Sequence, residues 1–140
     1  MPIVCRYECN GCKFDIEALD RHMYVMDDKG KKILCKHSGE QLALSRVLGI
    51  KRWEAFLWLT GKPDMLDYPT RELLDARVGI DYTCLCMDCL HLFGLDVDRE
   101  PRQCPECGRR EIKRLFELRG CCCPKCKTGT MKDCGIMVLP

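Results

Sequence analysis

The sequence predicts an α+β fold in which small, metal-stabilised β-hairpin modules at both ends of the chain are joined by a short helical segment. Three observations predict this. The 14 cysteines make up a tenth of the 140 residues, a density typical of folds framed by cysteine. Many of them stand in Cys-x2-Cys pairs, which begin at residues 9, 86, 104 and 123. Residues 39–80 lack cysteine and histidine, and their apolar residues recur at helical spacing.

The clearest metal site is predicted at Cys86, Cys89, Cys104 and Cys107, two pairs separated by fourteen residues. This spacing is close to that of structural zinc sites, in which four thiolates surround one ion at about 2.3 Å. Each two-residue gap turns the backbone so that its N–H groups point at the sulfurs. Gly108 suits such a turn because it tolerates a positive φ. The alternative is two disulfides or free core cysteines.

Residues 82–116 resemble a zinc ribbon on three features. An aromatic residue and a cysteine pair lie in Tyr82–Cys89, Phe93 follows, and the second pair lies in Cys104–Gly108. The resemblance implies zinc-ribbon β-hairpin modules and a bound Zn2+ ion. It also implies a setting in gene expression, and it names no particular partner.

The resemblance is weaker at residues 5–38 and 120–135. A rubredoxin, which holds iron on the same two turns, is a poorer match to the 86–107 site. The reason is that Leu90 stands where rubredoxins usually carry glycine. Iron at this site is therefore the alternative to zinc.

The N-terminal module, residues 1–38, is predicted to hold a second metal ion on Cys9, Cys12, Cys35 and His37. The residues between these two pairs predict a β-hairpin with a glycine-containing loop. Such a hairpin would carry the second pair back beside the first. Cys5 and, more weakly, His22 are alternative fourth ligands.

The middle segment, residues 39–80, is predicted to form three helices at 39–48, 51–60 and 71–78, each ended by a glycine. Ser38 and Gln41 match a capping box at the start of the first helix.

The second helix has an unusually wide apolar surface that includes Trp53, Phe56 and Trp58. We expect this surface to be buried, and an interaction surface is the alternative.

The C-terminal half is predicted to contain the ribbon at residues 81–119 and a further metal-binding turn at residues 120–140. A strand is favoured over a short helix for residues 109–118. The third metal site is predicted at Cys121, Cys123, Cys126 and Cys134, with Cys122 or Cys84 as alternatives for the fourth ligand. The cysteines left free would be Cys5, Cys84 and Cys122.

The formal net charge of +2 falls below zero once thiolate sites are counted, because a four-thiolate zinc site carries a net charge of −2. A general affinity for nucleic acid is therefore not expected. Residues 99–132 nevertheless hold ten Lys or Arg against four Glu. The candidate nucleic-acid contacts in this stretch are Arg109, Arg110, Lys113, Arg114, Lys125 and Lys127.

The first residues lack the apolar region of a signal peptide, and no apolar run has the length of a membrane span. We therefore expect a cytoplasmic protein, in whose reducing environment cysteine pairs are metal ligands.

The predicted function is a non-catalytic scaffold that docks on a protein or an RNA- or DNA-containing assembly, with no small-molecule substrate and no membrane. Closed, thiolate-rich sites favour structure over catalysis, and no arrangement typical of an active site is found. Two alternatives remain. The first is an iron electron carrier at Cys86–Cys107, and the second is a thiol or metal sensor at Cys121–Cys123.

Overall fold

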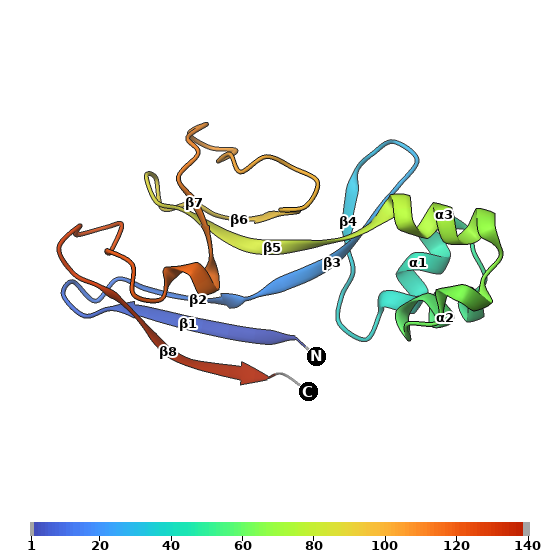
Figure 1. Cartoon of the computed structure of the whole chain (residues 1–140), viewed down its shortest axis with the longest axis horizontal. Helices are drawn as coiled ribbons and strands as arrows, with labels where there is room; N and C mark the ends of the chain where they lie inside the picture. Colours follow the sequence, from blue (N-terminus) through green and yellow to red (C-terminus); the bar gives the residue numbers. More distant parts are fainter. Residues whose placement is uncertain (1, 139–140) are drawn as a thin grey trace. The chain divides into compact units, whose positions relative to one another are not determined.

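The computed structural model describes residues 2–138 and is a mixed α/β structure (Figure 1). The chain divides into two compact units. Unit 1 combines the residues up to Arg21 with those from Asp81 onward, and unit 2 is His22–Ile80. This division differs from the four consecutive segments expected, 1–38, 39–80, 81–119 and 120–140. It differs because the first and last parts of the chain form one sheet, so unit 2 is an insertion within unit 1.

The first sheet of unit 1 joins the two ends of the chain (Figure 1). Its strands are β1 (Ile3–Cys9), β2 (Asp15–Leu19) and β8 (Met131–Val138), in the antiparallel order β2-β1-β8. Cys9, the last residue of β1, pairs with Met131, the first residue of β8.

A second set of three antiparallel strands in unit 1 is centred on β5 (Val78–Cys86), which pairs with both β6 (Leu92–Leu95) and β7 (Ile112–Arg114). A short 3-10 helix, η2 (Leu115–Leu118), follows β7. Cys86, the last residue of β5, pairs with Ile112, the first residue of β7.

These two sets of strands have the same topology and the same register. In both, the central strand ends at the first cysteine of a pair, and the next strand begins three residues after the second cysteine. In both, the third strand begins five residues after the last cysteine of another pair, opposite the end of the central strand. Unit 1 therefore contains two equivalent three-stranded ribbons.

The core of unit 1 follows from the two-residue periodicity of β1. Cys5, Tyr7 and Cys9 are buried, whereas the intervening Arg6 is exposed, because successive side chains of a strand point to opposite faces. The buried face packs with residues from β2, β5, η2 and β8 in one cluster, which includes Ile16, Leu85, Leu115, Leu118 and Met131. A smaller cluster around Cys84, Cys86, Leu95, Cys104 and Ile112 supports the second ribbon.

Unit 2 contains the predicted hairpin and helices. The hairpin is β3 (Arg21–Met26) and β4 (Lys32–Leu34), and the helices are α1 (Glu40–Leu48), α2 (Arg52–Leu59), the 3-10 helix η1 (Pro63–Met65) and α3 (Tyr68–Arg77). The predicted capping box at Ser38 is wrong: Gly39 is the N-cap of α1 and no side chain caps it. No helix within residues 2–138 has both the length and the apolarity needed to cross a membrane.

The core of unit 2 collects apolar residues from the hairpin and all three helices, including Val25, Leu44, Ala55 and Leu74. Trp58 packs against this core, as expected for α2. Trp53 and Phe56 do not, and they remain 55% and 52% exposed. The apolar surface of α2 is therefore divided between a buried side and an exposed side.

Arg114 is held between two aromatic rings in unit 1. Its guanidinium lies 3.7 Å from the centre of the Tyr82 ring and 4.5 Å from that of Phe116. Its backbone N–H donates to Glu117 Oε1 at 2.8 Å, and the same oxygen accepts from Arg102 Nη1 at 2.8 Å. The sequence suggested Arg114 as a nucleic-acid contact, but its guanidinium is already engaged, so a structural role fits it better.

We predict that Arg114→Ala lowers the free energy of unfolding of unit 1 by about 1–2 kcal/mol, because two cation–π contacts are lost. Hydrogen exchange of the β5–β7 amides measures this. Arg110→Ala is the matched control, since Arg110 is exposed. Equal exchange rates in the two variants would contradict the structural role.

Candidate metal centres

Eight of the cysteines form two groups of four in unit 1. Group A is Cys9, Cys12, Cys123 and Cys126, and group B is Cys86, Cys89, Cys104 and Cys107. Within each group all four sulfurs lie within 4.8 Å of one another. Each group belongs to one of the two equivalent ribbons and is assembled from two Cys-x2-Cys turns.

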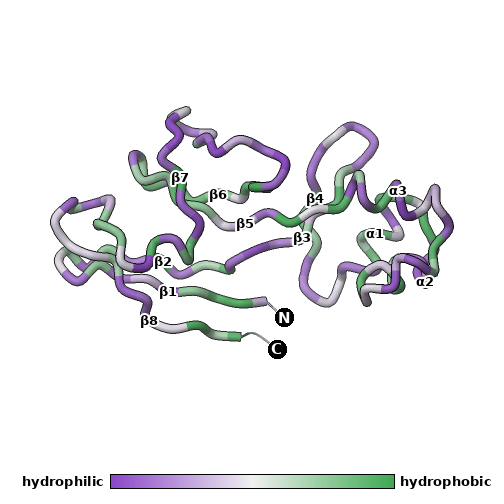
Figure 2. The backbone as a smooth tube through the Cα atoms, in the orientation of Figure 1, coloured by the Kyte–Doolittle hydropathy of each residue, from purple (hydrophilic) through white to green (hydrophobic). Residues whose placement is uncertain are grey.

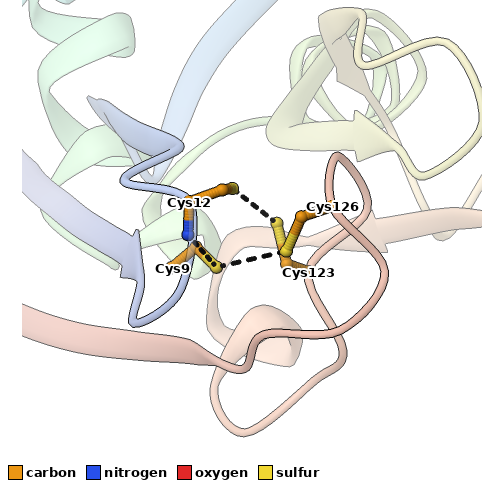
Figure 3. A group of neighbouring side chains, drawn as sticks. All are labelled: Cys9, Cys12, Cys123 and Cys126. Atoms are coloured by element: carbon orange, nitrogen blue, oxygen red, sulfur yellow. Dashed lines mark hydrogen bonds between the residues drawn. The ribbon is translucent and has the colours of Figure 1, made fainter.

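The spacing of the sulfurs is that of a metal site. In group A the Sγ atoms of Cys9 and Cys126, and those of Cys12 and Cys123, are 3.7 Å apart (Figure 3). In group B the corresponding distances are 3.6 Å and 3.5 Å. Sulfurs about 2.3 Å from a tetrahedral ion are about 3.8 Å apart, whereas a disulfide bond is about 2.05 Å long. Both groups could therefore hold a metal ion, and all 14 cysteines are free thiols.

The four turns share one backbone conformation. The residue after the second cysteine has a positive φ in every turn: 65° at Lys13, 67° at Leu90, 73° at Gly108 and 62° at Lys127. In three turns the N–H of this residue donates to the carbonyl of the first cysteine at 2.9 Å. Three of the four positions carry a side chain, although the left-handed backbone conformation costs a residue with a Cβ atom about 1–2 kcal/mol. Leu90 therefore adopts the turn without the glycine typical of rubredoxins.

Backbone N–H groups point at the sulfurs and favour their charged form. In group A, Gly11 N–H donates to Cys9 Sγ and Gly129 N–H donates to Cys126 Sγ, both at 3.2 Å. Hydrogen bonds from the Thr128 backbone, the Thr128 hydroxyl and the Gly129 backbone lower the pKa of Cys126 to about 5. Those from the backbones of Cys12 and Gly11 likewise lower the pKa of Cys9.

The remaining thiols show why each group needs a cation. For Cys12, a hydrogen bond from the Phe14 backbone lowers the pKa, but desolvation and the neighbouring thiols outweigh it and raise the pKa to about 11. For Cys89, the His91 backbone acts in the same way and the pKa still rises to about 12. Four thiolates this close repel one another, so a bound metal ion would be needed to keep all four deprotonated.

Group A is assembled by the pairing of the first and last strands. Its turns are fastened to each other by Asn10, whose N–H donates to Thr130 O at 3.1 Å and whose Oδ1 accepts from Thr130 N–H at 3.0 Å. Gly129 lies so close to Cys9 Sγ that a Cβ atom there would overlap the sulfur. The sequence therefore needs glycine at residue 129 for the two turns to meet.

Access differs between the two cysteines of each pair. The first cysteine of every pair is buried, whereas Cys12, Cys89 and Cys107 are exposed and Cys126 is half-buried. One side of each group is consequently open to solvent.

Group B contains the four cysteines that the sequence indicated. Group A differs from the predicted ligand sets, because Cys9 and Cys12 meet Cys123 and Cys126 in place of Cys35 and His37. Cys35 lies in the core of unit 2, and His37 is exposed beside Glu40, with 3.7 Å between Nδ1 and Oε1. The hairpin β3–β4 that precedes Cys35 belongs to unit 2, whereas the Cys9 turn belongs to unit 1.

The predicted third site is likewise not assembled as expected. Cys121 belongs to neither group and donates its S–H to Glu117 O at 2.9 Å. Cys134 is exposed on β8. Two residues of that set, Cys123 and Cys126, serve group A, and no third group of this kind forms within residues 2–138.

One sequence signal could have indicated the observed grouping. The pairs beginning at Cys104 and Cys123 both carry proline after their first cysteine, and each is the second pair of its group. The pairs beginning at Cys9 and Cys86 lack it, and each is the first. Matching a pair without proline to a pair with proline would have joined Cys9 to Cys123.

The buried cysteines outside the groups have the properties of core thiols. Burial raises the pKa of Cys84 and of Cys35 to about 11 and also raises that of Cys5. Such thiols are protonated at neutral pH and are poor metal ligands.

Of the candidate nucleic-acid contacts, Arg109, Arg110, Lys125 and Lys127 are exposed and Lys113 is half-buried. Lys125 and Lys127 flank Cys126, and the exposed Lys13 follows Cys12 in the opposite turn. Three exposed lysines are therefore adjacent in sequence to the cysteines of group A. The turns of group B carry acidic residues instead, Asp88 and Glu106.

Comparisons of the chain with models of protein families, with curated proteins and with solved structures give no match. The fold and the sites define a mixed α/β protein with two four-cysteine groups that could hold metal ions.

We predict that Gly129→Ala weakens metal binding at group A by at least tenfold, because the new methyl group overlaps Cys9 Sγ. Competition with a chelator measures the two affinities, and group B is expected to be unchanged. Gly11→Ala is the matched control, since a Cβ there meets its nearest atom, Gly129 Cα, at an ordinary 3.5 Å. Equal metal affinities in the two variants would show that the close approach is unimportant.

Proposed function

We propose that this protein is a non-catalytic zinc-binding scaffold that docks on a protein or ribonucleoprotein assembly in gene expression. The observation that carries the proposal is the pair of four-sulfur groups, each with sulfur spacings near those of a tetrahedral ion. Four thiolates fill the coordination sphere of zinc and leave no position for a substrate or a water molecule. Such sites stabilise a fold and present rigid turns.

Zinc is favoured over other ions by ligand chemistry. Structural zinc sites are commonly built from four cysteines in Cys-x2-Cys pairs, and zinc has no redox chemistry that would damage exposed thiolates. The setting in gene expression rests on the resemblance of residues 82–116 to a zinc ribbon, and cytoplasmic localisation remains an expectation from the sequence.

Elemental analysis of protein purified under reducing conditions tests the proposal. We expect two zinc ions per chain and no absorbance in the visible spectrum. Cys107→Ser should remove one equivalent and Cys126→Ser the other. A chain that binds no metal, or that retains two ions in either variant, would contradict the proposed sites.

An iron electron carrier is the second candidate. The exposed second cysteines of group B, Cys89 and Cys107, favour it, because electron transfer needs a ligand near the surface. Iron held by four thiolates absorbs visible light, so a coloured protein with iron in place of zinc would support this candidate and overturn the zinc scaffold.

Group A is the better place for contact with the nucleic acid of such an assembly. Lys13, Lys125 and Lys127 are exposed, and no ion pair is seen for them in the described part of the chain. Three lysines exceed the net charge of −2 of a loaded four-thiolate zinc site. The alternative is that these lysines balance the negative charge of the site and contact no nucleic acid.

Replacement of Lys125 and Lys127 by alanine tests this contact. If they bind phosphates, the slope of log K against log salt concentration for a single-stranded RNA should fall by about 0.7 for each lysine. The double replacement of Lys29 and Lys31, two exposed lysines of unit 2, is the matched control. An unchanged slope would leave protein docking as the function of the scaffold.

A further inference from the structure

The segment from Gly120 to Val138, here called the C-terminal arm, contributes few side chains to the core. Seven of the eight residues of β8 are exposed, and only Met131 is buried. The far end of the strand is apolar (Figure 2). Its residues Ile136, Met137 and Val138 are exposed by 63%, 58% and 53%. Hydrophobic burial therefore does little to hold β8 in place.

Group A fastens the near end of the arm to the turn after β1. Cys123 and Cys126 belong to the arm, and Cys9 and Cys12 belong to the turn after β1. The Asn10–Thr130 hydrogen bonds lie directly beside the sulfurs. Beyond this point the arm is joined to β1 by strand pairing, which is irregular between Cys5 and Tyr7.

Group B takes none of its ligands from the arm, although Leu85 of β5 packs in the same core cluster as Met131 of the arm. All four of its cysteines precede Gly120, and its ribbon has its own buried cluster. Its second turn is also tied to η2 by Arg102, whose Nη1 donates to Ile112 O at 3.1 Å and to Glu117 Oε1 at 2.8 Å. Loss of group B would therefore remove no ligand of group A and none of the Asn10–Thr130 hydrogen bonds that join the arm to the turn after β1.

The two groups also differ in the length of chain that they close. The sulfurs of group A come from residues 111 and 117 positions apart, whereas those of group B are 15 and 21 positions apart. Closing a longer segment costs more conformational entropy. A metal ion that bridges the two halves of group A therefore stabilises the closed chain more than an ion in group B does.

We propose that group A is a metal-responsive clasp: a bound thiophilic divalent cation holds the C-terminal arm on β1, and removal of the ion releases the arm while the rest of unit 1 stays folded. This rests on the metal binding of the proposed function. It places metal sensing at group A, in contrast to the Cys121–Cys123 cluster that the sequence suggested. Release would expose the edge of β1 and make the arm an extended peptide.

Hydrogen exchange of the zinc-loaded full chain tests the clasp, with Cys126→Ser compared with Cys107→Ser as the matched control. We expect the amides of β8 to exchange at least tenfold faster in Cys126→Ser and to be unchanged in Cys107→Ser. Trypsin should then cut after Lys132 only in the first variant. The β8 amides of Cys107→Ser, which retains only the ion of group A, should lose protection as a chelator removes that ion.

Exchange in β5, α1 and α3 reports whether each variant is folded, and metal content is measured on the same samples. If Cys126→Ser loses one metal equivalent and β8 keeps its protection, the clasp is wrong and the metal site stands. If β8 loses protection equally in both variants, the arm follows the stability of the whole unit and the clasp is also wrong. If the unaltered protein binds no metal, the proposed function fails together with the clasp.

Discussion

The mutual repulsion of four thiolates is the constraint on which unit 1 depends. In each group, desolvation and the neighbouring thiols raise the pKa of one thiol, to about 11 at Cys12 and to about 12 at Cys89, even though backbone N–H groups favour the charged form. A cation at the centre would turn this repulsion into attraction and fix two turns against each other. The first turn of each group lies at the end of a central strand and the second turn precedes the third strand, so the same ion would also set the register between these two strands.

The two ribbons share one geometry despite very different sequence separations between their turns. The same register appears around Cys9 and Cys86, although the second turn of group A lies 111 residues from the first and that of group B only 15. By the logarithmic law for loop closure, the longer separation costs about 1.8 kcal/mol more. The ribbon geometry is therefore a property of the turns and their sulfurs, and the chain tolerates a large insertion between them.

Local spacing explains what the sequence predicted well. The four cysteines of group B are close together in sequence, and the helices of unit 2 have clear periodicity, so these features were expected. Glycines follow α1 and α2 as predicted, but α3 ends at Arg77 and its C-cap is Val78. The partners of Cys9 and Cys12 were missed because the nearest candidates, Cys35 and His37, also fitted a hairpin return. Only the pairing of β1 with β8 decides against them, and that is a contact between distant parts of the chain. The stacking of Arg114 between Tyr82 and Phe116 likewise depends on β5 and η2 meeting, which no local pattern signals.

The long separation within group A has a consequence for the order of events during synthesis. A ribosome that adds roughly 5–20 residues per second needs on the order of 10 s to make the chain between the two turns of this group. Throughout that interval Cys9 and Cys12 are present without Cys123 and Cys126, whereas unit 2 and group B receive all their residues before the interval ends. The nascent protein therefore completes its inner parts first and joins its two ends last.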